Sequence, residues 1–198
     1  MPLLSLPFSP KSVNRIRLLI QRLAMFVGLG LLLCTADPSA AQDKPSEYQV
    51  KAAFLLNFAR FVEWPEGTNQ DTLRICIVGN DPFGDAFQTI LGRAPGSQPV
   101  HIMHPAAADV PGVDCHILFV SDSGSRELAR ILHQTHHEPM LTVGDADGFA
   151  RAGGMVGFIL RNNKIRFQIN STAATHAGLR LSAKLLRLAE IVDDGGDD

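Results

Sequence analysis

The sequence predicts an α/β domain: a Rossmann-like, mixed and mainly parallel sheet flanked by helices, with a C-terminal β-hairpin and helix. Short apolar runs that fit buried strands alternate with segments of helical periodicity over residues 42–192, which favours a parallel sheet covered by helices. Two apolar runs near the end of this region bracket Asn162-Asn163, as in a tight hairpin. The chain has 198 residues, 45% of them hydrophobic, which is enough for one core of ordinary size.

The first element is a helix that begins at Ser46 and ends before Trp64-Pro65. Ser46 with Gln49 three residues later fits a capping box, in which each side chain binds a free amide of the other residue. Apolar side chains then recur four, four and three residues apart, at Val50, Phe54, Phe58 and Phe61. The helix must end before Trp64, because a residue that precedes proline avoids helical geometry.

Shorter elements follow in the alternating order of a doubly wound sheet. Strands are expected at 73–78, 100–103, 117–120 and 140–143. Short helices are expected at 82–91 and 125–134, with a loop over 105–113. The strand at 117–120 is apolar throughout, which is typical of a strand covered on both faces.

The C-terminal part is expected to be a hairpin followed by one helix. Residues 156–160 and 165–169 form the hairpin, and the second run alternates apolar with polar residues, so one face should be exposed to water. The last helix should begin near Ser171. Its leucine face is spaced four, three and four residues apart, at Leu181, Leu185, Leu188 and Val192.

Residues 1–41 are expected to be a secretory signal peptide. Four basic residues precede the apolar run 23–33, which is shorter than the roughly 20 residues that a membrane-spanning helix needs. Ser39 and Ala41 are the small residues that suit cleavage before Gln42. Lipidation at Cys34 and an uncleaved membrane anchor are the alternatives. Export with cleavage near Ala41 is therefore the prediction.

Charge and composition exclude one class of function. Removing residues 1–41 removes four of the 18 basic and one of the 20 acidic residues, which leaves a net charge of −5. A nucleic-acid-binding domain needs a basic surface to neutralise phosphates, so no nucleic-acid partner is expected. Residues 193–198 form an acidic tail, which is expected to be disordered.

Cys76 and Cys115 remain after cleavage. An even number of cysteines in an exported protein favours a disulfide. The two residues lie in or beside the first and third expected strands, which are often neighbours in a doubly wound sheet. Two buried free thiols are the alternative.

Two loops follow strands at the positions where doubly wound folds bind ligands. Their candidate ligand-binding residues are Asn80, Asp81, Ser121 and Ser123. Neither the dinucleotide fingerprint Gly-x-Gly-x-x-Gly nor the nucleophile motif Gly-x-Ser-x-Gly is present, so neither a cofactor nor a catalytic residue is expected. Simple helix-starting turns are the alternative for both loops.

Three histidines lie close together near the end of the second short helix. His133, His136 and His137 have spacings at which two of them could face one metal ion. However, Glu138-Pro139 ends the segment, and no cysteine or carboxylate follows at ligand spacing. Histidines that interact with the helix dipole are the favoured interpretation, and no metal site is predicted.

Two groups of polar residues are candidates for partner binding. The first, beside the single Trp at the end of an apolar helix, is Asn57, Arg60, Glu63 and Trp64. Its alternative is a helix-end salt bridge with a partly buried Trp. The second is a basic stripe on the last helix, formed by Arg180, Lys184 and Arg187. The stripe would be either a docking edge for an acidic partner or an ordinary solvated face.

A family resemblance rests on a series of blocks rather than on any single motif. In order, they are KAAFLLNF (51–58), FVEWP (61–65), LRICIVG (73–79), DPFG (81–84), HILFVS (116–121), GGMV (153–156) with Phe158, IRFQIN (165–170) and LSAKLL (181–186). In this order and spacing, the chain resembles the YfiR-like family of bacterial periplasmic proteins from about Tyr48 to Val192.

The resemblance implies a periplasmic regulator without catalytic activity. Such a protein would bind the periplasmic part of a membrane-bound diguanylate cyclase and repress it, which lowers cyclic di-GMP and limits biofilm formation. An outer-membrane OmpA-like lipoprotein would sequester the repressor. The resemblance also implies a homodimer and sensitivity to redox state. A periplasmic small-molecule sensor domain is the alternative function.

The resemblance also bears on the cysteines. Cys76 and Cys115 match the family's first cysteine pair. Some members carry a further pair near 150–157, where this chain has Ala150 and Gly157. Redox switching through a second bridge is therefore not expected in this chain.

Overall fold

The computed structural model describes residues 45–68, 71–92 and 98–193. Residues 45–198 group as one compact unit of the chain. The expected signal peptide and residues 194–198 of the expected tail lie outside the described residues.

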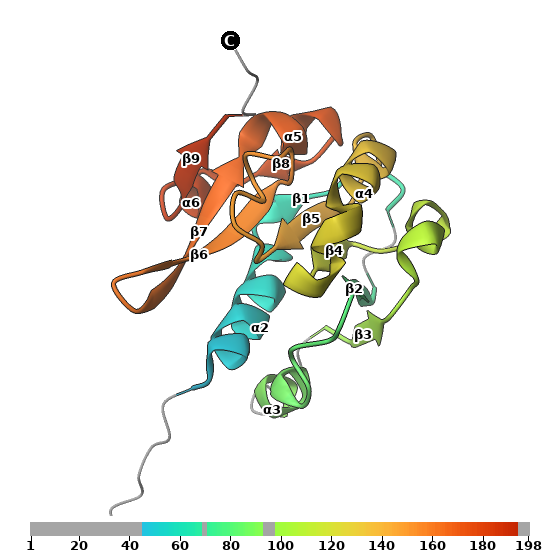
Figure 1. Ribbon diagram of the computed structural model, residues 1–198. Helices are drawn as coiled ribbons and strands as arrows, with labels where there is room; N and C mark the ends of the chain where they lie inside the picture. Colours follow the sequence, from blue (N-terminus) through green and yellow to red (C-terminus); the bar gives the residue numbers. More distant parts are fainter. Residues whose placement is uncertain (1–44, 69–70, 93–97, 194–198) are drawn as a thin grey trace, which may run out of the picture. The chain divides into compact units, whose positions relative to one another are not determined.

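A seven-stranded sheet runs through the domain in the order β3-β2-β4-β5-β6-β7-β9 (Figure 1). Its strands are β2 Leu73–Val78, β3 Val100–Met103, β4 Ile117–Val120, β5 Leu141–Gly144, β6 Val156–Arg161, β7 Lys164–Asn170 and β9 Glu190–Val192. β2 to β6 are parallel, β7 is antiparallel to β6, and β9 is parallel to β7. The predicted α/β class with a mixed, mainly parallel sheet is confirmed. The first five strands have the 2-1-3-4-5 order of doubly wound folds.

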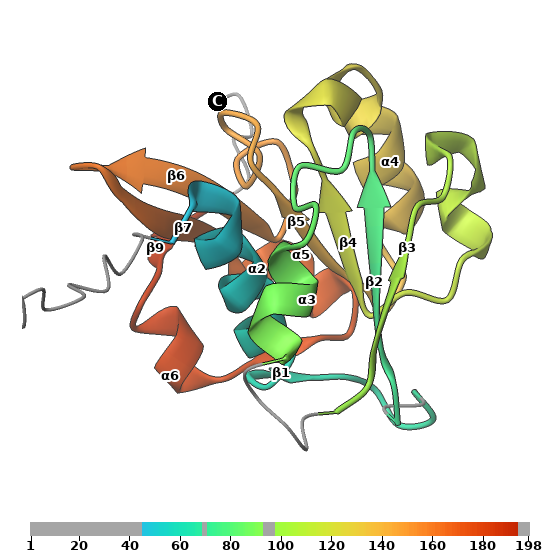
Figure 2. The same cartoon turned by 90° about the horizontal axis from the view of Figure 1, so that it is seen from below.

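Helices cover both faces of this sheet (Figure 2). Alternate residues of β2 divide between two cores, as the two-residue period of a strand requires. Ile75 and Ile77 pack in the cluster that contains Leu55 of α2 (Glu47–Phe58) and Phe87 of α3 (Ala86–Leu91). The intervening Cys76 packs in the second cluster, which the 3₁₀ helix η1 and the helix α4 supply with further side chains. These two elements are η1 Ala107–Gly112, where a loop was expected, and α4 Leu128–Thr135.

α2 begins as the sequence predicted but ends earlier. The Gln49 amide donates to Ser46 Oγ at 3.2 Å, and the Ser46 amide donates to Gln49 Oε1 at 2.8 Å, so the capping box is confirmed. The helix ends at Phe58 rather than just before Trp64. The chain then turns, and Val62–Glu63 forms strand β1, which pairs with β8 (Arg180–Leu181) in a separate two-stranded sheet. Long-range pairing takes these residues out of the helix.

The hairpin is confirmed, with one correction to its expected water-exposed face. Asn162 and Asn163 have φ of 50° and 58°, as a type I′ turn requires of both central residues. Arg166 is exposed, but Gln168 is buried. β9 pairs beside β7, and Gln168 Nε2 donates to Glu190 Oε1 at 2.9 Å. β9 thus buries Gln168, which the alternation of apolar and polar residues in β7 predicts to be exposed.

The single C-terminal helix predicted from the sequence is wrong. The segment forms α5 (Ser171–His176), β8, α6 (Ala183–Leu186) and β9. Gly178 follows α5 with φ of +74°, a conformation that ends helices. Ser182 then caps α6 by accepting from the Leu185 amide at 3.3 Å. Leu188 is 63% exposed, so it does not belong to one continuous apolar helix face.

Candidate partner-binding surface

The pairing of β1 with β8 joins the two groups of residues that were predicted separately to bind a partner. Glu63 lies directly opposite Arg180, and Val62 lies opposite Leu181. Arg180 Nε lies 3.8 Å from Glu63 Oε2, with both side chains mostly exposed. A contact over more than a hundred residues of sequence therefore places members of both groups on one surface.

Lys184 extends this surface from the adjoining helix α6. Its Nζ lies 5.2 Å from the centre of the Phe61 ring, within the range of a cation–π contact. The Ser182 amide also donates to the Phe61 carbonyl at 2.9 Å. We define the ribbon surface as the exposed residues Arg60, Glu63, Arg180 and Lys184. Three cations against one carboxylate make it basic, although the mature chain carries a net negative charge.

The predicted basic stripe is corrected in its geometry. Arg180 lies in β8, Lys184 lies in α6, and Arg187 is the C-cap of α6. They do not form one stripe along one helix, because the helix ends before Gly178 and a separate helix, α6, begins after its N-cap Ser182.

Two members of the first group do not belong to the ribbon surface. Trp64 is partly buried, with its ring edge-to-face against His116 at 5.5 Å between centroids. Its Nε1 is buried and has no hydrogen-bond acceptor among the described residues. Asn57 is exposed and donates to the Ala53 carbonyl one turn earlier at 2.8 Å. Trp64 is therefore partly buried, as in the alternative given for this group, and Asn57 lies on a different part of the surface.

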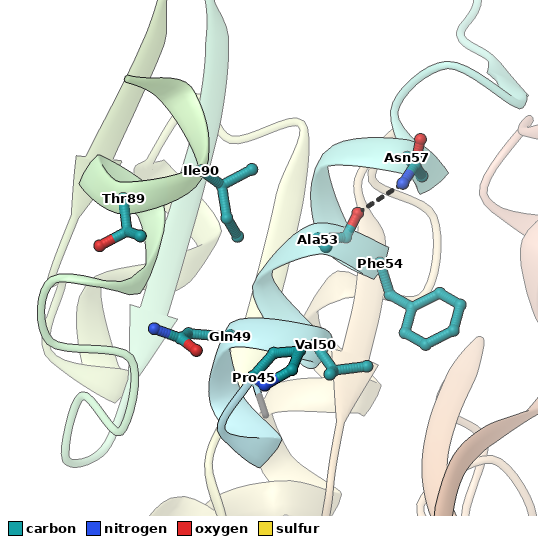
Figure 3. A pocket seen from close by; sticks show the side chains of 8 residues that line it. All are labelled: Pro45, Gln49, Val50, Ala53, Phe54, Asn57, Thr89 and Ile90. Atoms are coloured by element: carbon teal, nitrogen blue, oxygen red, sulfur yellow. Dashed lines mark hydrogen bonds between the residues drawn. The ribbon is translucent and has the colours of Figure 1, made fainter. Parts of the chain in front are cut away.

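Asn57 borders a shallow groove of about 330 Å³ between α2 and α3. Figure 3 shows Thr89 and Ile90 of α3 on one side and the outer face of α2 on the other, with Phe54 directed away from α3. Its wall is mainly apolar, with lining residues Pro45, Gln49, Val50, Ala53, Phe54, Asn57, Thr89 and Ile90. No group in this wall carries a formal charge, so the groove offers apolar contact rather than charge recognition.

The four candidate ligand-binding residues lie together after β2 and β4, at the point where the strand order reverses. The Asn80 amide donates to Ser123 Oγ at 2.8 Å, and Ser121 Oγ donates to the Val78 carbonyl at 3.1 Å. The two serine hydroxyls are 2.8 Å apart. These polar groups therefore bond one loop to the other.

The remaining candidate, Asp81, is also engaged within the protein. Its Oδ1 accepts from the Phe83 amide at 2.8 Å, and its Oδ2 lies 2.8 Å from His104 Nε2. The first contact forms an Asx turn. This turn delays the start of α3 to Ala86 instead of residue 82.

A buried charged network was not foreseen from the sequence. Lys51 Nζ lies 2.8 Å from Asp145 Oδ2 and 2.7 Å from Glu47 Oε1, and Tyr48 donates its hydroxyl to Asp145 Oδ2 at 3.1 Å. Lys51 and Asp145 side chains are each 5% exposed. Glu47 lies one helical turn before Lys51 and is a local partner. Nothing near Lys51 in the sequence indicates its second partner, Asp145, which follows β5.

The network shifts two pKa values. Burial by itself lowers the pKa of Lys51, but hydrogen bonds to Asp145 and Glu47 outweigh it, so the net direction is upward. Burial and then the charge of Asp145 raise the pKa of Tyr48. Both shifts favour the protonated forms, so at neutral pH the network holds a charged lysine and a neutral tyrosine.

The predicted disulfide between Cys76 and Cys115 is present in the structure. Cys76 lies in β2, and Cys115 lies two residues before the neighbouring strand β4, with Cα atoms 6.0 Å apart. Cys76 is fully buried. Cys115 borders a separate cavity of about 440 Å³ beside Pro65–Thr68. The bridge therefore joins β2 to the segment just before β4, and its Cys115 end borders this cavity.

The family is decided by a comparison that spans the domain just described. The family model DUF4154, described as YfiR/HmsC-like, matches residues 48–190. The chain belongs to the YfiR/HmsC-like family. Membership supports a role as a periplasmic regulator of diguanylate cyclase signalling in general. The members are regulators rather than enzymes.

One solved structure supports the fold of this YfiR/HmsC-like chain. A conserved domain protein from Vibrio cholerae O1 biovar El Tor str. N16961 aligns with a TM-score of 0.51 at 11% identity. The alignment covers 74% of this chain and 60% of that one, so the chain spans about three fifths of its length. The ABC domain in complex with L-Trp from Streptococcus pneumonia aligns with a TM-score of 0.43 at 8% identity, over 61% of this chain and 55% of that one.

Two features are absent from the described residues. Among the described residues, no helix is both long and apolar enough to cross a membrane. Within the same ranges, no three histidine, cysteine or acidic side chains are already arranged to hold one metal ion. The disulfide and the family fit an extracytoplasmic protein, while the signal peptide stays a prediction.

Proposed function

We propose that this YfiR/HmsC-like chain binds the periplasmic part of a membrane-bound diguanylate cyclase and holds the enzyme inactive. Cyclic di-GMP in the cytoplasm would then stay low, which limits biofilm formation. The observation that carries the proposal is the family match across residues 48–190, nearly the whole described domain. Export by the predicted signal peptide would bring the domain to the periplasm, where the periplasmic part of such a cyclase lies.

The ribbon surface is the proposed contact with the cyclase. Arg60, Arg180 and Lys184 are exposed, and charged residues at the rim of an interface speed association with an oppositely charged partner. An acidic segment of the cyclase is therefore the proposed counterpart. The apolar groove between α2 and α3 would contribute contact area beside Asn57.

The proposal includes two further partners. A second copy of the chain would form a homodimer, and an OmpA-like lipoprotein of the outer membrane would sequester the regulator and release the cyclase. The alternative function, a small-molecule sensor at Asn80 and Ser121, is not favoured. The polar atoms of those loops bond to each other and to the backbone.

The test is recovery of the partner together with the nucleotide level. Tagged mature domain should recover a membrane-bound diguanylate cyclase from solubilised membranes, and deletion of the gene should raise cellular cyclic di-GMP. If no cyclase is recovered and the nucleotide level is unchanged, the proposed function is wrong.

A pair of charge reversals tests the surface separately. Arg180→Glu with Lys184→Glu should weaken cyclase binding about tenfold or more, equivalent to roughly 1.4 kcal/mol, and should weaken it most at low salt. Arg126→Glu with Arg151→Glu makes the same change in charge at two other exposed positions. If both double variants bind and repress equally, the regulator stands and the ribbon surface is not its docking site.

A further inference from the structure

Four histidines from α4, the residues that follow it and α5 lie close together. His133 belongs to α4, His136 and His137 follow it, and His176 is the last residue of α5. The first three border a cavity of about 560 Å³. All four are exposed, so an ion in solution can reach their rings. His176 is the member that only the fold supplies.

The contact of His137 with α5 fixes which of its nitrogens carries the proton. His137 Nδ1 lies 3.4 Å from the His176 carbonyl oxygen. A carbonyl oxygen can only accept a hydrogen bond, so Nδ1 carries the hydrogen and Nε2 keeps its lone pair. A hydrogen bond from the far nitrogen to a backbone carbonyl is the arrangement that orients metal-binding histidines.

The free nitrogen of His137 faces a second imidazole. His136 Nδ1 lies 3.2 Å from His137 Nε2. Two nitrogens bound to one tetrahedral ion, each about 2.0–2.1 Å from it, are about 3.3 Å apart. The two rings are nearly perpendicular, at 83°. The distance between the two nitrogens is therefore close to that of two nitrogens bound to one ion, although a hydrogen-bonding proton now lies between them.

His176 supplies the third ring. Its centroid lies 5.0 Å from that of His136, at an interplanar angle of 49°. As placed, the described side chains do not yet put three ligand groups around one point. Binding of one ion by all three rings therefore requires His176, which is exposed at the end of its helix, to change its side-chain rotamer.

We propose that His136, His137 and His176 bind one divalent late transition-metal ion, Cu²⁺, Ni²⁺ or Zn²⁺. A ligand set of imidazoles alone suits these ions, and Cu²⁺ should bind most tightly. His136 is the C-cap of α4, where the helix dipole favours a cation. The ion would link the ends of α4 and α5. This inference is independent of the proposed contact with a cyclase.

The experiment titrates the untagged mature chain with Cu²⁺ and Co²⁺, by calorimetry and by visible absorption. We expect one Cu²⁺ per chain with a dissociation constant in the micromolar range or below, and a Co²⁺ absorption band in the visible region. His136→Gln, His137→Gln and His176→Gln should each weaken binding at least tenfold. His101→Gln, an exposed histidine on β3, should leave binding unchanged.

Two outcomes would overturn the proposal. One is the absence of binding at micromolar metal in the native chain. The other is unchanged affinity in His176→Gln, because the site would then be at most an exposed pair. Far-UV circular dichroism of each variant without metal shows that it is folded. A rise in melting temperature with Cu²⁺, present in the native chain and absent in His176→Gln, gives a second readout.

Discussion

Reducing the Cys76–Cys115 bridge should lower the free energy of unfolding by about 4 kcal/mol. The two residues are 39 apart in sequence, and closing a loop of that length removes about 13 cal/mol/K of entropy from the unfolded chain by the chain-entropy relation. Reduction leaves both sulfur atoms in place, so it separates the cross-link from packing. In a domain of this size, the loss corresponds to a melting temperature about 12 °C lower.

Urea unfolding of the mature domain, followed by circular dichroism with and without a phosphine reductant, measures this loss. The matched control is the double variant Cys76→Ala/Cys115→Ala, on which the reductant should have no effect. Cys76 is fully buried, so this variant should be at least as unstable as the reduced protein. A loss below about 1 kcal/mol on full reduction would show that the cross-link does not constrain the unfolded chain as argued.

Three further predictions concern backbone geometry, a buried charge and the pH dependence of stability. Gly79→Ala should destabilise the domain by about 2–4 kcal/mol in urea unfolding, because φ is +89° and an added Cβ would overlap two serine hydroxyls. Gly148→Ala, at φ +74° with open space around it, should cost only about 1 kcal/mol, and equal losses would contradict the overlap. Lys51→Met should cost about 3–5 kcal/mol, because it leaves Asp145 buried without its cation. Lys51 and Tyr48 both have raised pKa values in the folded protein. Their contribution to the free energy of unfolding is therefore present below about pH 10 and is lost as the pH rises through the folded-state values. If the native chain and Lys51→Met lose the same stability between about pH 10 and 12, this reasoning is wrong.

Much of the fold could be predicted because its signals are local. β2 and β4 are short apolar runs, and their residues pair with each other as a doubly wound order requires. The capping box of α2 and the two asparagines of the hairpin act within a few residues. The neighbouring cysteines followed from this strand order, so the disulfide could be predicted from two positions in the sequence.

The candidate site could be predicted only in its parts. Glu63 and Arg180 were identified separately, but nothing in either segment shows that they lie opposite each other. Apolar residues spaced four, three and four apart suggested one helix over a segment that instead forms two strands and two short helices. The leucine spacing alone could not show that a helix ends at Gly178 and that the residues after it form separate short elements.

By itself, the sequence determined the fold class and the order of the central elements, because short-range periodicity, capping and turn residues act on neighbours in the chain. The family followed instead from the resemblance carried by the ordered sequence blocks. The tertiary structure decided which distant groups meet. It paired β1 with β8, placed Asp145 on Lys51 and brought His176 to His137. These contacts depend on where buried charges and free backbone amides find partners in space, and local sequence patterns do not encode that choice.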